Sequence, residues 1–210
     1  MTRIKFCGLT RMQDIEAVNG FLPEYIGFVF YKKSKRYVTF EKAGELKKKL
    51  NKSIKAVGVF VDEAPGKVAE AANNGIIDII QLHGQEDDEY VKTLRDLTDA
   101  KIIKAFQIKQ DSISDDEKNG LLENIIKGIN EFPSDMVLVD SGQGTGKAFN
   151  WDILRMIERD YFLAGGINRG NIEEAVLIHP YAIDVSSGIE TDGIKDEEKM
   201  RKMISAVRNR

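Results

Sequence analysis

Two residues that could transfer protons each close a short apolar run. Cys7 ends the run that begins at Ile4, and Asp140 follows residues 136–139. A cysteine thiolate acts as a base or a nucleophile when the pKa of the thiol lies below its ordinary value of about 8.5. A carboxyl group at the end of such a run is partly desolvated, which favours its protonated form and suits a general acid. The alternatives are a small buried cysteine and an aspartate that caps or ion-pairs at a strand end.

Two further groups of residues favour the binding of anions. Gly165-Gly166 and Ser187-Gly188 end later apolar runs, and glycine lets backbone N–H groups approach an oxyanion closely. As a pair they predict a phosphate site, although each alone could be an ordinary turn. Arg36 offers a planar guanidinium that can clamp a carboxylate through two hydrogen bonds. Since Arg36 stands in a basic run, a solvated surface charge is the alternative.

The two histidines and the glycine-rich segment 141–147 complete the candidates. His83 follows another apolar run and is expected to bind substrate or to hydrogen-bond within the fold, whereas His179 is expected to be structural. With two histidines and one cysteine, none clustered, we expect no transition-metal site. The segment is not a nucleotide-binding P-loop, because Ser141 replaces the first glycine and Ala148 the metal-binding serine or threonine. It is expected to form a lid over the site, with a plain flexible loop as the alternative.

Predicted strands and helices alternate along the chain and position these residues. Continuous apolar runs, typical of strands buried on both faces, begin near positions 4, 25, 56, 76, 102, 136, 161 and 182. Helical spacing lies between them, at Met200, Met203, Ile204 and Val207 behind a cap at Asp196, at Ala43, Leu46 and Leu50, and at Tyr90, Leu94 and Leu97. Capping boxes are expected at Thr10 with Gln13 and at Asn171 with Glu174.

The alternation of strand and helix predicts parallel strands with right-handed crossovers. Eight units in 210 residues average 210/8, or about 26 residues, which favours a single (β/α)8 TIM barrel over residues 1–210. An open doubly wound sheet is the alternative, but Cys-Gly-Leu-Thr follows the first run in place of a glycine-rich dinucleotide loop. In such a barrel the chemistry lies at the carboxyl ends of the strands, where the candidates fall. The weakest part of the pattern is 107–134, which is polar and helical only around 121–129.

The composition narrows the possible partners. The chain has 31 Lys and Arg against 34 Asp and Glu, a formal charge of −3, and lacks the basic footprint of a nucleic-acid-binding protein. No apolar run reaches the roughly 18 residues of a membrane span, and the first residues lack the apolar stretch of a signal peptide. A single cysteine cannot form a disulfide within the chain, which indicates a reducing compartment. We expect a cytoplasmic protein, a monomer or a homodimer, without nucleic-acid or membrane partners.

Six motifs at the predicted strand ends follow one another in a fixed order. They are KFCGLT at 5–10, GFVF at 27–30 with SKR at 34–36, QLHG at 81–84, VDSGQGTGK at 139–147, LAGGI at 163–167 and DVSSGIE at 184–190. Together they resemble the motifs of the phosphoribosylanthranilate isomerase family of tryptophan biosynthesis. The resemblance implies a cofactor-free aldose–ketose isomerase acting on a small-molecule phosphosugar. The implied reaction is an Amadori rearrangement of N-(5-phosphoribosyl)anthranilate to 1-(2-carboxyphenylamino)-1-deoxyribulose 5-phosphate.

The resemblance also implies a role for each candidate residue. Cys7 would be the general base and Asp140 the general acid, and Arg36 would bind the anthranilate carboxylate. The glycine loops after the seventh and eighth strands would bind the phosphate and so place the sugar between base and acid.

Two other functions are compatible with the sequence. The histidine-pathway isomerase performs the same rearrangement on an aminoimidazole ribotide, but that family resembles a repeated half-barrel with an aspartate base, whereas here the first run ends in Cys7. A non-catalytic phosphosugar-binding barrel would keep the glycine loops and have no need of Cys7 or Asp140.

Overall fold

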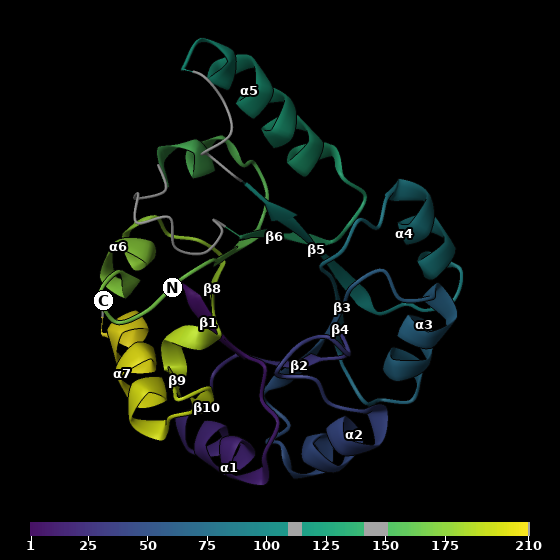
Figure 1. Ribbon diagram of the computed structural model, residues 1–210, viewed down its shortest axis with the longest axis vertical. Coiled ribbons are helices and arrows are strands. Elements are labelled where there is room, and N and C mark those ends of the chain that lie inside the picture. Colours follow the sequence, from purple (N-terminus) through teal and green to yellow (C-terminus); the bar gives the residue numbers. More distant parts are fainter. Residues whose placement is uncertain (109–114, 141–150, 210) are drawn as a thin grey trace.

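Eight parallel strands close into a barrel, as the sequence predicts. The computed structural model describes residues 1–108, 115–140 and 151–209 (Figure 1). The strands are β1 Arg3–Cys7, β2 Tyr25–Val29, β3 Lys55–Phe60, β4 Ile79–Leu82, β5 Lys101–Gln107, β6 Met136–Asp140, β7 Tyr161–Ala164 and β8 Ala182–Val185. They follow one another around the barrel in chain order, and β1 pairs with both β2 and β8. The sheet is therefore closed, and the open doubly wound alternative is wrong.

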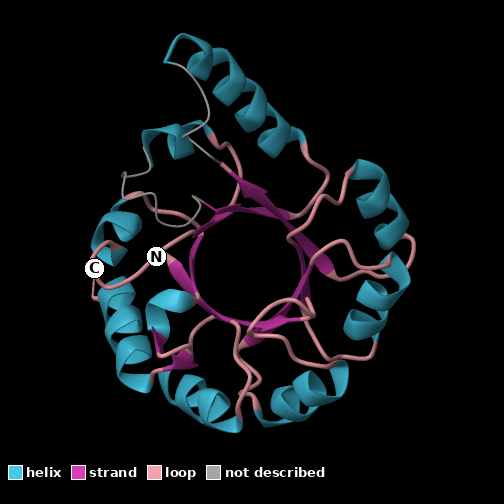
Figure 2. Ribbon diagram, in the orientation of Figure 1, coloured by secondary structure: helices cyan, strands magenta, loops and turns pink. Residues whose placement is uncertain are grey.

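The helices form a ring outside the strands (Figure 2). They are α1 Met12–Phe21, α2 Phe40–Lys49, α3 Pro65–Asn73, α4 Asp88–Arg95, α5 Asp115–Glu131, α6 Ile172–Leu177 and α7 Glu197–Arg208. Two 3₁₀ helices, η2 Trp151–Met156 and η3 Ser187–Ile189, and a ribbon of β9 Glu190–Thr191 with β10 Ile194–Lys195 complete the described elements. None of the helices in the described ranges has the length and hydropathy to cross a membrane.

The helical spacing predicted for α7 and α2 is confirmed. Asp196 caps α7 by accepting a hydrogen bond from the Lys199 N–H, and the predicted apolar stripe is buried: Met200, Met203, Ile204 and Val207. Ala43 and Leu46 are likewise buried in α2, and Leu50 is buried directly after its end. Burial of these apolar faces against the barrel stabilises helices too short to persist alone.

Two elements are shifted from their predicted positions. In α4 the buried residues are Val91 and Leu94, whereas Leu97 lies beyond the helix and is exposed. β4 begins at Ile79 rather than near 76. The reason is that Ile76 and the next residue donate their N–H groups to a carbonyl at the end of α3, so this apolar stretch first closes the helix.

Both predicted capping boxes are wrong in detail. In α1 the box is displaced by one residue, because the Asp14 carboxylate accepts from the N–H groups of Thr10 and Arg11. Asn171 does precede α6, but its side-chain oxygen accepts from the Asn168 N–H and orders the preceding loop instead.

The segment with the weakest sequence pattern contains a long helix. α5 begins six residues before the predicted start and ends at Glu131. Ile126 and Ile129 are buried on the barrel side. Directly after the helix, Phe132 packs edge-on against Phe106 of β5, with ring centroids 5.4 Å apart. The two buried isoleucines fall where the sequence already shows helical spacing, whereas residues 115–120 contain no apolar side chain.

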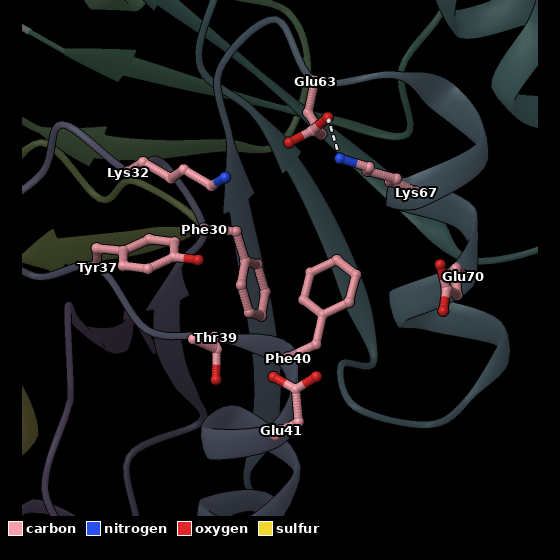
Figure 3. Close-up of a pocket in the computed structure, with 9 residues that line it drawn as sticks. All are labelled: Phe30, Lys32, Tyr37, Thr39, Phe40, Glu41, Glu63, Lys67 and Glu70. Atoms are coloured by element: carbon pink, nitrogen blue, oxygen red, sulfur yellow. Dashed lines mark ion pairs between the residues drawn. The ribbon is translucent and has the colours of Figure 1, made fainter.

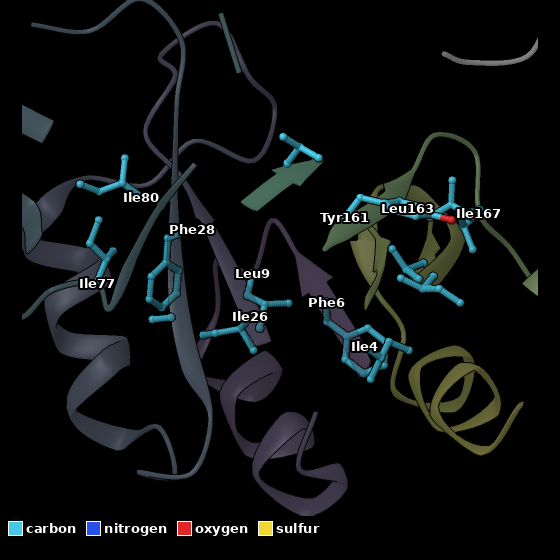
Figure 4. Packing of buried hydrophobic residues seen from close by; sticks show 14 of the residues in the cluster. Ile4, Phe6, Leu9, Ile26, Phe28, Ile77, Ile80, Tyr161, Leu163 and Ile167 are labelled. Atoms are coloured by element: carbon cyan, nitrogen blue, oxygen red, sulfur yellow. The ribbon is translucent and has the colours of Figure 1, made fainter. Parts of the chain in front are cut away.

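Alternation along each strand separates an outer core from the barrel interior. Ile4 and Phe6 of β1 belong to the outer core between strands and helices, which also contains Leu163 of β7 (Figure 4). Lys5 and Cys7 therefore face inward, because side chains two residues apart lie on one face of a strand. The rest of the interior holds a smaller apolar cluster of Tyr25, Val57, Ile79, Ile103, Ala105, Met136, Leu138, Phe162, Ala164 and Ala182. Lys5, Cys7 and the other polar side chains that point inward form a site in the same interior.

Candidate active site

A cavity of about 270 Å³ opens at the carboxyl ends of the strands. Strands β1 to β4 and β6 to β8, or the loops that follow them, supply its walls. Seven of the eight residues predicted from the sequence line it: Cys7, Arg36, His83, Asp140, Gly165, Gly166 and Ser187. The lining also includes polar residues to which the sequence analysis gave no role: Tyr31, Ser34, Gln81, Asp184 and Ser186.

A second hollow, of about 290 Å³, lies on the outside of the barrel near the starts of α2 and α3 (Figure 3). Phe30 and Phe40 meet edge to face within it, at a centroid distance of 4.8 Å. Lys67 pairs with Glu63 at 3.6 Å on its rim. Its lining residues are Phe30, Lys32, Tyr37, Thr39, Phe40, Glu41, Glu63, Lys67 and Glu70. None of these is a predicted site residue, so the chemistry belongs to the first cavity.

The Cys7 thiol sits against the neighbouring strand at a glycine. Cys7 is 8% exposed, and a Cβ built on Gly27 would lie 2.6 Å from the Cys7 Sγ. Burial raises the pKa of the thiol; the Lys5 and Lys195 ammonium groups lower it in part, and Asp184 raises it further. A lowered pKa would make Cys7 a thiolate at neutral pH. The shift has the opposite direction, because desolvation outweighs the nearby positive charges.

A buried lysine lies beside this thiol. Lys5 is fully buried, and its Nζ donates to Asp184 Oδ2 and to Gln81 Oε1, both at 2.8 Å. Burial alone would lower the pKa of Lys5, but Asp184 and Cys7 raise it, and the net shift is upward. Within the described residues, Asp184 Oδ1 is buried without a hydrogen-bond partner. The sequence held a signal for this pair, since a lysine and an aspartate interrupt otherwise apolar strands.

Arg36 is held by a carboxylate rather than lying free in a basic run. Its Nε and Nη2 donate to the two oxygens of Glu190 at 2.6 and 2.7 Å, and these hydrogen bonds raise the pKa of the guanidinium. Lys195 Nζ donates to the same carboxylate at 2.6 Å. Gly8 has φ +81°, and a Cβ there would lie 2.4 Å from the Arg36 Cδ. A glycine beside Cys7 thus makes room for the arginine stem.

Asp140 and His83 face each other on the opposite side of the cavity. Asp140 Oδ2 lies 3.8 Å from His83 Nε2, and the Asp140 side chain is 24% exposed. His83 Nδ1 lies 3.0 Å from Gln81 Nε2. Burial lowers the pKa of His83, although the Asp140 carboxylate opposes the shift. The candidate acid therefore lies nearer to solvent than the candidate base.

The predicted anion loops lie together after β7 and β8. Gly165 and Gly166 have φ of 95° and 63°, a conformation that favours glycine. Ser187 begins η3, and a Cβ on Gly188 would lie 2.0 Å from the carbonyl oxygen of Ile167. Gly188 therefore lets the two loops approach each other and is not among the residues that line the cavity.

The other sequence predictions fall elsewhere. The proposed lid at 141–147 lies outside the described residues. His179 lies two residues after α6, where its N–H donates to the Val176 carbonyl, and it does not line the cavity. In the described ranges, no three His, Cys, Asp or Glu side chains are grouped so as to hold a metal ion.

Comparison of the sequence with family models and with curated proteins identifies the same family in both cases. A family model described as N-(5'phosphoribosyl)anthranilate (PRA) isomerase matches residues 4–206. A relative from Thermoanaerobacter sp. (strain X514) is 41% identical, over 99% of this chain and 98% of its own length. One from Clostridium acetobutylicum is 43% identical over the same shares. Both are named N-(5'-phosphoribosyl)anthranilate isomerase.

Solved structures give the same result. Phosphoribosyl anthranilate isomerase from Thermotoga maritima is 32% identical, with a TM-score of 0.85 over 100% of both chains. Another structure of such an isomerase, 30% identical with a TM-score of 0.82 over 100% of both chains, is a complex with reduced 1-(o-carboxyphenylamino)-1-deoxyribulose 5-phosphate. A third, from Thermotoga maritima, concerns monomers of a dimeric isomerase and is 31% identical, with a TM-score of 0.81 over 100% of both chains.

Proposed function

The chain belongs to the N-(5'-phosphoribosyl)anthranilate isomerase family, and from this premise we propose how its residues carry out the reaction. The enzyme is an aldose–ketose isomerase of tryptophan biosynthesis. It converts N-(5-phosphoribosyl)anthranilate to 1-(2-carboxyphenylamino)-1-deoxyribulose 5-phosphate by an Amadori rearrangement. The family match sets aside the histidine-pathway isomerase and the non-catalytic barrel.

Asp140 acts as the general acid. It gives a proton to the ribose ring oxygen, the bond from that oxygen to sugar carbon 1 breaks, and the nitrogen lone pair forms an iminium. Its place supports this role, because Asp140 closes β6 at the mouth of the cavity and is partly exposed to solvent. A carboxyl group there can regain its proton between turnovers.

Cys7 acts as the general base. The iminium acidifies the hydrogen on sugar carbon 2, the thiolate removes that proton, and the electron pair forms an enolamine. The enolamine then takes a proton at carbon 1 and loses its hydroxyl proton to give the ketone. Because burial raises the pKa of the Cys7 thiol, the thiolate depends on the Lys5 ammonium and on the positive charge of the iminium.

Arg36 binds the anthranilate carboxylate. A guanidinium has five N–H donors, and Glu190 engages its Nε and Nη2. The remaining donors of this fixed plane suit a second carboxylate. Glu190 therefore orients the Arg36 guanidinium and leaves donors for the anthranilate carboxylate.

The glycine loops bind the phosphate. Gly165, Gly166, Ser187 and Gly188 lie after β7 and β8, which separate β6 from β1 in the closed barrel. A phosphate held there places the sugar between Asp140 and Cys7. His83 and Asp184 also line this space. Asp184 Oδ1, which has no hydrogen-bond partner among the described residues, can accept a hydrogen bond from a sugar hydroxyl.

The cellular location and the assembly are part of this proposal. A cytoplasmic location is supported by a chain with one free cysteine, since a reducing compartment keeps a base thiol available. A monomer or a homodimer suits the site, because the described residues of one chain supply all the groups named above.

The observation that carries the proposal is the placement of Cys7 and Asp140 on one cavity with the paired glycine loops between them. The experiment follows the loss of phosphoribosylanthranilate fluorescence, with the unstable substrate generated in place. Cys7→Ala and Asp140→Asn should each lower turnover by about 10²–10⁴-fold, while both variants still bind the reduced product analogue. Near wild-type turnover in either variant would reject that residue's role.

A further inference from the structure

A chain of polar contacts crosses the barrel from Lys5, which lies beside the base, to the acid Asp140. Lys5 Nζ on β1 lies 2.8 Å from Gln81 Oε1 on β4. Gln81 Nε2 lies 3.0 Å from His83 Nδ1, directly after β4. His83 Nε2 lies 3.8 Å from Asp140 Oδ2 at the end of β6. The reaction scheme above uses both ends of this chain and leaves its middle without a role.

The lysine determines which way the Gln81 amide faces. A lysine ammonium has three donors and no acceptor, so the Gln81 atom next to Lys5 Nζ must be the oxygen. The Gln81 Nε2, which carries only donor hydrogens, must then face His83. Lys5 cannot turn away cheaply, because it is fully buried and also donates to Asp184.

The amide in turn determines where the histidine carries its proton. Since Gln81 Nε2 donates, His83 Nδ1 must accept, and a nitrogen that accepts a hydrogen bond carries no proton. The single ring proton is then on Nε2, the atom that faces Asp140. A charged ring would place two donors against each other at the Gln81 contact.

We propose that the Lys5–Gln81–His83 chain holds His83 as a neutral ring protonated on Nε2, and that His83 is thereby a positioning residue for Asp140. The inference rests on the acid role of Asp140 proposed above. The distance of 3.8 Å to Asp140 Oδ2 is longer than a hydrogen bond, and catalytic hydrogen bonds of this kind commonly tighten only in the substrate complex.

A neutral ring matters because Asp140 must hold a proton before it can give one. An imidazolium beside Asp140 would favour the carboxylate and remove the acid. A neutral N–H still supports the carboxylate that forms as the proton leaves. Among the described residues, the charged groups that act on His83 are Asp140 on β6, Lys5 on β1, Asp184 on β8 and Lys104 on β5, and burial is the largest cause of its lowered pKa.

The protonation state of the ring can be measured without any reaction. The chain has two histidines, so ¹⁵N-labelled protein without a histidine tag gives two sets of ring signals in a long-range proton–nitrogen correlation. His179→Asn assigns them, because His179 lies away from the site and asparagine accepts its positive φ of 57°. We expect His83 at neutral pH to show a protonated Nε2 and an unprotonated Nδ1.

Kinetics separate a positioning role from a merely structural one. His83→Leu removes the donor and should lower kcat on the order of 10–100-fold with little change in KM. His83→Gln, a neutral side chain that keeps an N–H donor, should recover a large part of that loss. Gln81→Glu places an acceptor against Nδ1, so kcat should fall most at low pH, where the ring is charged. It should stay below the wild-type value at higher pH, because the neutral ring then carries its proton on Nδ1 and Nε2 has none.

Two results would overturn the inference. One is a wild-type ring at neutral pH that is protonated on Nδ1 or on both nitrogens. The other is an equal loss in His83→Leu and His83→Gln with an unchanged pH profile for Gln81→Glu. Failure of the proposed function looks different, because wild-type protein would then show no isomerase turnover whatever the state of the ring.

Discussion

The base side and the acid side of the cavity are built in opposite ways. Cys7 is 8% exposed and has the buried Lys5–Asp184 pair beside it. Asp140 is 24% exposed and has a neutral histidine as its neighbour. One proton-transfer group is thus enclosed and surrounded by charge, and the other is open and has a weak donor beside it.

The difference follows from what each group must do. A thiol that is hidden from water reacts only with the bound sugar, but burial raises the pKa of Cys7, and positive charge nearby must offset this. An acid that has to be reprotonated in every cycle gains from access to solvent. We therefore expect the base side to depend on a few contacts, and their loss to lower stability or activity strongly.

The largest effect is expected where the buried ion pair is broken. Lys5→Met leaves the Asp184 carboxylate without its cation in the barrel interior and should lower the free energy of unfolding by about 3–5 kcal/mol, measured by urea denaturation. The double variant Lys5→Met with Asp184→Asn should recover much of this loss, because no buried charge remains.

An exposed pair provides the control for that measurement. Lys42 and Glu45 lie 3.5 Å apart on α2, with side chains 46% and 66% exposed, and Lys42→Met should cost less than about 1 kcal/mol. If Lys5→Met lowered the free energy of unfolding no more than Lys42→Met does, the buried charges would not stabilise the base side.

A smaller effect is expected where the thiol meets β2. Gly27→Ala puts a Cβ within 2.6 Å of the Cys7 Sγ, so the thiol has to move, and a displacement near 1 Å can lower kcat/KM by about 100-fold. Gly44→Ala in α2 is the matched control, since its Cβ meets nothing within 4 Å; its activity should stay at the wild-type level. Equal activity in both variants would show that the position of the thiol is not critical.

The smallest effect is expected at the rim of the base side, where Glu190 fixes Arg36. Glu190→Gln keeps the size of the side chain but offers one acceptor oxygen to a guanidinium that now uses two. We expect KM for phosphoribosylanthranilate to rise on the order of tenfold with kcat nearly unchanged. A fall in kcat with constant KM would instead assign Glu190 to the chemical step.

The sequence predicted the barrel because its strands are continuous apolar runs that closely match the observed β1 to β8. Local signals failed where tertiary contacts decide. The ends of α1 and α6 are shaped by Asp14 and Asn171, whose partners depend on how the loops pack. The start of α5 was missed for another reason, because residues 115–120 contain no apolar side chain and so show no helical spacing.

The sequence also brought the right residues to the cavity but not their environment. Cys7 and Asp140 could be picked out as reactive types at strand ends, since a parallel barrel gathers such ends at one mouth. The direction of the pKa shift of Cys7 was not accessible, because it depends on a balance of burial and three charged neighbours. Lys5, Gln81 and Glu190 were missed as partners because their contacts join residues far apart in the chain.

The central claim is that the Cys7 thiolate is the base, and one pair of pH titrations tests it directly. Cys7 is the single cysteine, so ¹³Cβ-labelled cysteine gives one NMR signal that reports its ionisation. Since burial raises the pKa of the thiol, we expect its midpoint above the ordinary value for cysteine. Both titrations use Asp140→Asn, whose residue 140 does not titrate, and its residual kcat/KM should rise with pH through the same midpoint as the NMR signal. In that variant, a kcat/KM that is already at its maximum where Cys7 is still a thiol, with no further rise as the thiolate forms, would contradict the claim.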